Sequence, residues 1–196
     1  MNFDNYVTKR PSVWGMGGRV IGKLLLALLC CDVLLVSTFM LFQYVWLLWI
    51  LEVIVLAIMI AFLYSPLHLR GAKDRGYYER NQMKPDKLYG LKAGLIGCAP
   101  FVLTTVWLIL MNQGILPDVF IVYRILNPFF WPLISIFAPS AYAIDLSWYH
   151  FVYLFLLDMI IPLTCHFGYT MGLKGIFVGD RILYKNKSKE TDKPQK

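Results

Sequence analysis

The stretch Leu24–Tyr64, LLLALLCCDVLLVSTFMLFQYVWLLWILEVIVLAIMIAFLY, decides the fold class of this chain. It holds 41 residues and only two charges, Asp32 and Glu52. One helix of that length would measure about 60 Å, which is roughly twice the ~30 Å hydrocarbon core of a bilayer. The stretch must therefore fold back on itself, and its most polar point, Phe42–Tyr44, predicts the hinge. We interpret it as two antiparallel membrane spans, Ile21–Leu41 and Val45–Leu63.

The composition of the whole chain agrees with this interpretation. Hydrophobic residues make up 58% of the 196 residues and charged residues 16%, whereas soluble domains are about half apolar and a quarter charged. The formal net charge is nevertheless +7. In so apolar a chain, basic residues are typical of the cytoplasmic side of a membrane, and a nucleic-acid partner is not expected.

Two further spans are predicted, at Leu88–Met111 and Trp148–Phe167. Ser65-Pro66 is expected to end the second span, and the polar segment Leu67–Lys92 is expected to form short helical pieces. The fold class is therefore all-α: a four-span transmembrane helix bundle, with residues 1–175 as one domain and 176–196 as a basic cytoplasmic tail. The last dozen residues are polar enough to predict disorder.

The apolar segment Val119–Phe137 is predicted not to cross the membrane. Pro128 and Pro132 interrupt it, and each proline removes a backbone donor and clashes with the preceding turn. Arg124 near its start adds a charge that is costly in hydrocarbon. We interpret the segment as re-entrant or interfacial.

The distribution of basic residues predicts the topology. Of the nineteen Lys and Arg residues, four precede or open the first span, seven lie between the second and third spans, seven follow the fourth, and only Arg124 remains. The positive-inside rule then places both termini in the cytoplasm of a plasma membrane. A fifth span at Val119–Phe137 would move the seven tail charges to the outside.

Three acids lie inside predicted spans, at Asp32, Glu52 and Asp158. Asp32 lies ten residues before Phe42 and Glu52 ten residues after it, so a hairpin hinged there would bring both to the same depth, about 15 Å along each helix. Intramembrane carboxylates are candidates for a proton or cation site. The alternative is that they are neutral or paired groups that hold helices together, with Arg124 as a candidate partner.

Two other groups of residues are candidate contact sites. Gly90, Gly94 and Gly97 recur at three- to four-residue spacing, which predicts close helix packing in the third span. The basic loop could dock anionic lipid headgroups or a cytoplasmic partner, although it could equally be an ordinary positive-inside loop. Its basic residues are Arg70, Lys73, Arg75, Arg80, Lys84 and Lys87.

No sequence motif indicates catalysis, a metal ion or a cofactor. The four cysteines lack metal-ligand spacing, and adjacent Cys30 and Cys31 within one span do not fit quinone-linked disulfide chemistry, which needs redox cysteines near the membrane surface. Phosphate-binding glycine loops, HExxH and GxSxG are also not found.

Two stretches carry a resemblance to known proteins. They are Arg70–Gly94, which contains RGAKDR and RNQMKPDK before GLKAG, and Gly168–Gly175, GYTMGLKG, followed by Tyr184-Lys185. Together they resemble uncharacterised small multi-pass membrane proteins of Gram-positive bacteria. The resemblance implies a bacterial plasma-membrane protein and carries no function.

The function expected from the sequence is non-enzymatic. An accessory subunit or a self-associating bundle fits the small size and the glycine-lined span, with another membrane protein or a second copy as partner. The alternative is a small proton- or cation-coupled transporter or channel that uses the intramembrane carboxylates. A wet cavity at the acids would favour the alternative, and dry, paired acids would favour the first interpretation.

Overall fold

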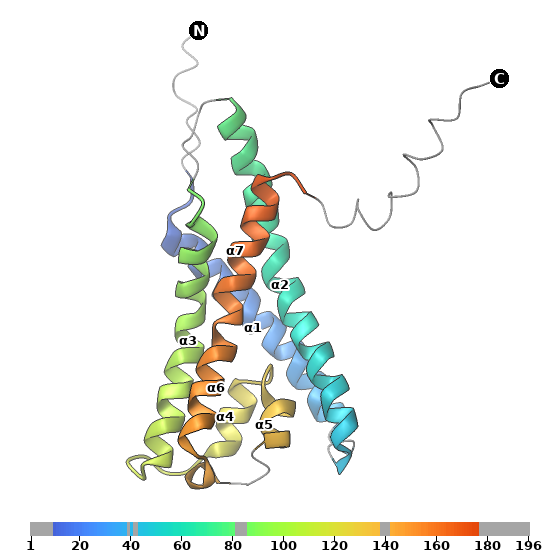
Figure 1. Cartoon of the computed structure of the whole chain (residues 1–196), viewed down its shortest axis with the longest axis vertical. Coiled ribbons are helices and arrows are strands. Elements are labelled where there is room, and N and C mark those ends of the chain that lie inside the picture. The colour runs from blue at the N-terminus through green and yellow to red at the C-terminus, as the bar shows by residue number, and fades with distance from the viewer. Residues whose placement is uncertain (1–9, 39, 41–42, 81–85, 138–141, 177–196) are drawn as a thin grey trace, which may run out of the picture.

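The computed structural model describes residues 10–38, 40, 43–80, 86–137 and 142–176. All regular structure in these ranges is helical, and Figure 1 shows long helices that run along the molecule with two short ones packed at one end. The helices are α1 Val13–Ser37, α2 Val45–Glu79, α3 Tyr89–Asn112, α4 Phe120–Leu126, α5 Trp131–Phe137, the short 3₁₀ helix η3 Ala143–Asp145, α6 Trp148–Asp158 and α7 Ile160–Leu173.

Four helical segments of the described chain are long and apolar enough to cross a membrane: α1, α2, α3 and the continuous pair α6–α7. The predicted all-α, four-span bundle is confirmed. The third helix coincides within one residue with the predicted Leu88–Met111. The fourth begins at the predicted Trp148 but continues to Leu173, beyond the predicted end at Phe167.

The first helix begins earlier than the apolar pattern predicts. It starts at Val13 because the Ser12 hydroxyl accepts the Gly15 amide at 3.0 Å and caps the helix. It ends at Ser37, four residues before the predicted end. The predicted end at Leu41, the hinge residue Phe42 and the tail beyond Ile176 lie outside the described residues.

The second helix corrects two predictions. Ser65-Pro66 does not end it, and Leu67–Lys92 does not begin as short pieces, because α2 continues through Pro66 to Glu79. A proline inside a helix removes one hydrogen bond. Here the packing of the part of α2 after Pro66 against α7 offsets that loss. Leu67 is fully buried, and a Cβ on Gly71 would collide with the Tyr169 carbonyl oxygen of α7. Tertiary packing thus outweighs the local signal of the proline.

The segment Val119–Phe137 forms two seven-residue helices rather than one. Each is about 10 Å long, too short to cross the hydrocarbon core. The Asp118 carboxylate accepts the Phe120 amide at 3.1 Å and caps α4, and Pro132 stands in the first turn of α5, where a missing donor costs nothing. In Figure 1 both helices lie in the lower part of the bundle, and α4 contacts α3 while α5 contacts α2.

Glycines set the closest helix crossings. Gly90 and Gly94 of α3 face α7, where an added Cβ would meet Cys165 and Pro162 atoms, whereas Gly97 faces Val20 of α1. The structure therefore places all three predicted packing glycines in interfaces within the bundle, against two different helices. The most extensive helix contact is between α2 and α7.

Both ends of the described chain lie at one end of the bundle. Arg10 contacts Asp74 of α2, and the Ile176 carbonyl oxygen lies 3.0 Å from His68 Nε2. We call this the charged end. The last turn of α1, the first turn of α2 and the connection 113–119 lie at the other end (Figure 1), as four crossings require.

Candidate functional site

The three predicted intramembrane acids occupy three different environments. Glu52 and Asp158 are 4% and 1% exposed, while Asp32 is half-buried. No hydrogen bond or ion pair joins any two of them, and the partners found for Glu52 and Asp158 are Leu133 and Thr105. The structure therefore does not bring the acids into one shared site.

Asp158 stands at an interruption of the last span. Pro162 has no N–H, so the Asp158 carbonyl lacks its regular helical donor, and α6 gives way to α7 at Met159. The Cys98 Sγ of α3 lies 3.3 Å from that carbonyl oxygen and replaces the missing donor. The Thr105 hydroxyl donates to the Asp158 carboxyl at 3.2 Å. Both groups of Asp158 are thus bonded to α3.

Glu52 binds the beginning of α5. Its Oε2 accepts the Leu133 amide at 3.3 Å, one of the first-turn donors that have no partner within their own helix. The carboxyl therefore acts as a helix cap supplied by a different helix, and it connects α2 to α5.

No hydrogen bond or ion pair joins Asp32 to Glu52. Lys23 lines a groove between α1 and α2, and Asp32 is nine residues further on, which is two and a half helical turns. Asp32 therefore lies on the opposite side of α1 from α2. Its buried Oδ1 has no hydrogen-bond partner among the described residues.

The junction between α4 and α5 is polar and buried. Asn127 is fully buried, its amide donates to the Tyr123 carbonyl at 3.0 Å, and its Oδ1 lies 3.1 Å from the Thr104 hydroxyl. The Arg124 guanidinium lies over the Phe120 ring of its own helix at 4.5 Å. Of these contacts, the Asn127 side-chain amide reaches the backbone, at the turn that ends α4 before Pro128.

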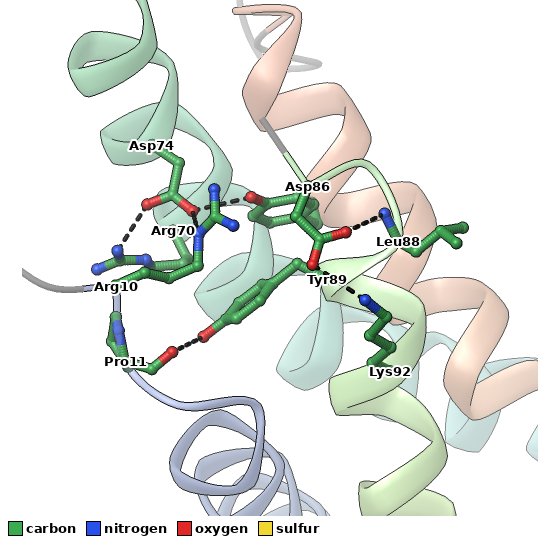
Figure 2. A network of polar contacts seen from close by, with 9 residues as sticks. Arg10, Pro11, Arg70, Asp74, Asp86, Leu88, Tyr89 and Lys92 are labelled. Carbon is green, nitrogen blue, oxygen red and sulfur yellow. Dashed lines mark hydrogen bonds and ion pairs between the residues drawn. The ribbon is translucent and has the colours of Figure 1, made fainter. Parts of the chain in front are cut away.

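The most connected polar site lies at the charged end (Figure 2). Asp74 of α2 is 1% exposed. Its Oδ1 lies 2.6 Å from Arg70 Nη2, and its Oδ2 lies 3.0 Å from Arg10 Nε and 2.8 Å from the Tyr169 hydroxyl. One buried carboxylate thus joins the N-terminal segment, α2 and α7. We call Arg10, Arg70, Asp74, Tyr89 and Tyr169 the Asp74 network.

Tyr89 brings α3 into this network. Its hydroxyl donates to the Pro11 carbonyl at 3.0 Å, its ring lies 5.2 Å from that of Tyr169, and the Arg10 guanidinium lies 5.2 Å above its ring centre. Figure 2 shows Arg10, Asp74 and Tyr89 pointing toward one another from the N-terminal segment, α2 and α3, and the hydroxyl of Tyr169 adds α7. The network therefore fixes how the four spans meet at this end.

The basic residues predicted for lipid or partner docking divide into two kinds. Arg70 points into the Asp74 network, and Arg75 pairs with Glu79 at 2.6 Å on the surface. Lys73, Arg80 and Lys87 are exposed, and Lys84 lies outside the described residues.

The sequence carried only a partial signal for the Asp74 network. Arg70 and Asp74 stand four residues apart, the spacing of a helical ion pair, but a helix through Pro66 was not predicted. Tyr169 and Arg10 lie far away in the chain, and nothing in their local pattern points to Asp74. Only the packing of α7 on α2 brings them together.

The described residues contain no group of three His, Cys, Asp or Glu side chains that could hold a metal ion. The fold defines a multi-pass membrane protein with four helical segments that can span a bilayer and a pair of short helices packed at one end. No family model, no curated protein and no solved structure matches the chain.

Proposed function

We propose that this chain is a non-enzymatic integral membrane protein that acts by association, either with a second copy of itself or, as an accessory subunit, with another membrane protein. The observation that carries the proposal is that the fully buried acids bond to other elements of the same chain. Glu52 holds α5, Asp158 holds α3, and Asp74 holds the N-terminal segment and α7. Groups used in this way stabilise a scaffold.

The outer face of α1 is the surface on which to test association. Gly18 and Gly22 are exposed, four residues apart, with open space around each, whereas the glycines of the helix interfaces, such as Gly97, are in contact within the bundle. Small residues at this spacing let membrane helices approach closely. Large apolar side chains continue the same face toward the other end, including Leu29 and Val33.

The test compares two substitutions that add the same bulk. Gly22→Leu fills the outer face of α1, and Ala57→Leu is the matched control, because Ala57 is exposed on the membrane-facing side of α2. Donor- and acceptor-labelled copies are mixed in liposomes at a low protein-to-lipid ratio. We expect energy transfer in the wild type, a loss toward the random-encounter level in Gly22→Leu, and no change in Ala57→Leu.

A second experiment covers the accessory-subunit form of the proposal. The tagged chain is purified from its native membranes, and a stoichiometric partner that is lost in Gly22→Leu and kept in Ala57→Leu supports that form. The proposal fails if the liposomes show no energy transfer above random encounter and no partner sensitive to Gly22 is recovered. It also fails if both substitutions have the same effect.

Location and orientation are part of the proposal. The charged end carries the exposed Lys73, Arg80 and Lys87, which favours a cytoplasmic position for it and for both termini. A bacterial plasma membrane agrees with the resemblance in the basic loop and the last span. The same exposed cations support contact with anionic lipid headgroups, each contributing on the order of 1 kcal/mol near the surface.

The alternative is transport of protons or cations. It is favoured by the interruption of the last span at Asp158, because broken helices with polar groups form the binding sites of many transporters. A pH-sensitive dye inside liposomes measures proton flux under an imposed gradient. A flux above that of empty liposomes that is lost in Asp158→Asn would favour transport and overturn the scaffold proposal.

A further inference from the structure

A groove between α1 and α2 lies on the membrane-facing side of the bundle. It is lined by Lys23 of α1 and by Ala61, Phe62, Ser65, Pro66 and Leu69 of α2, and its volume is about 430 Å³. This volume falls within the range of ~300–1,000 Å³ found for small-molecule sites. In Figure 1 the two helices lie close at the lower end and diverge toward the charged end.

The groove lies at the border between apolar and polar sequence. On α2, the residues that precede the groove are apolar from Val53 to Ile60. After the groove, toward the charged end, the first buried polar side chain is that of His68. Arg70 follows Ser65 by five residues, a rise of about 7.5 Å. Lys23 is the last basic residue before the apolar part of α1. This border is where the headgroups of a bilayer lie.

The groove offers one cation, one hydroxyl and one spare acceptor. Lys23 is exposed and has no acidic partner among the described residues, and the Ser65 hydroxyl makes no hydrogen bond there. Pro66 has no N–H, so the Phe62 carbonyl lacks its regular helical donor. An ammonium beside hydrocarbon favours an anionic partner, and an acceptor without a donor favours a ligand that donates.

We propose that this groove binds one anionic glycerophospholipid whose headgroup carries free hydroxyls. The phosphate accepts from the Lys23 ammonium, and a headgroup hydroxyl donates to the Phe62 carbonyl or exchanges a hydrogen bond with Ser65. One acyl chain follows the apolar wall formed by Ala61 and Phe62 toward the middle of the membrane. The site is separate from Gly18 and Gly22, because Gly22 lines neither wall of the groove.

The test measures lipid retention by native mass spectrometry. The full chain is released from nanodiscs that contain equal amounts of phosphatidylglycerol and phosphatidylcholine. We expect one phosphatidylglycerol per wild-type chain and about fivefold less in Lys23→Gln, the loss of one lysine's contribution. Lys174→Gln is the matched control, because Lys174 is an exposed lysine at the end of α7 outside the groove. It should retain lipid as the wild type does, and so should Lys23→Arg.

A second variant fills the groove without changing charge. Leu69 is 56% exposed, so Leu69→Trp leaves the buried core intact and should displace the lipid. Competition with phosphatidic acid tests the hydroxyl contact, and we expect it to displace phosphatidylglycerol poorly. The proposal is overturned if Lys23→Gln and Lys174→Gln lose lipid equally, if the wild type shows no preference for phosphatidylglycerol, or if phosphatidic acid competes equally.

Discussion

Removing the carboxylate at the centre of the Asp74 network should destabilise the bundle more than any surface charge change. In Asp74→Asn, the guanidinium groups of Arg10 and Arg70 lose the buried carboxylate with which each forms an ion pair. Breaking a buried ion pair costs about 3–5 kcal/mol. The side chains of Arg10 and Arg70 are 18% and 16% exposed, so water partly solvates them. The lower end of that range, about 3 kcal/mol, therefore applies.

The chain contains its own reporter for this experiment. Cys31, Cys98 and Cys165 are buried free thiols, whereas Cys30 is exposed. On a Cys30→Ser background, a thiol-reactive fluorophore reacts only as the bundle opens, so the temperature of half-reaction measures stability in detergent. A loss of about 3 kcal/mol corresponds to a decrease of roughly 10 °C for a chain of this size.

Asp86→Asn is the matched control. Asp86 pairs with Lys92 at 3.2 Å, but these side chains are 31% and 50% exposed, and such a surface pair contributes at most ~1 kcal/mol. Asparagine also keeps the oxygen that accepts the Leu88 amide. If Asp74→Asn and Asp86→Asn lower the temperature of half-reaction equally, the Asp74 network does not hold the spans together, and the reasoning is refuted.

Two further predictions concern packing and topology. Gly172→Ala should destabilise the bundle by about 2 kcal/mol or more in the same thiol assay, because the added Cβ would collide with the His68 carbonyl oxygen of α2. Gly22→Ala has open space and should be neutral or stabilising by up to ~1 kcal/mol. Equal effects of the two substitutions would contradict the close crossing of α7 and α2. A single cysteine at Gln113 should react with an impermeant reagent from outside the cell, and one at Lys87 only after permeabilisation; the reverse pattern would place the charged end outside.

The sequence by itself determined the fold class and the number of spans. Hydrophobic length is a local property of the chain, and the bilayer converts it directly into crossings. The 41-residue run before Tyr64 required a hairpin, and Pro128 and Pro132 required that Val119–Phe137 break. The glycines of the third span also carried a readable packing signal, although not which helix each would meet.

Only the tertiary structure decided what the polar groups do. Whether α2 continues beyond Pro66 depends on the energy of packing Gly71 against α7, which no local pattern contains. Asp32 and Glu52 were predicted at the same depth in the membrane, but no hydrogen bond or ion pair joins them. Depth follows from residue count, whereas the direction in which a side chain points depends on how its helix is rotated about its axis. Asp74 became the most connected carboxylate because segments 64 and 95 residues away in the chain fold against it.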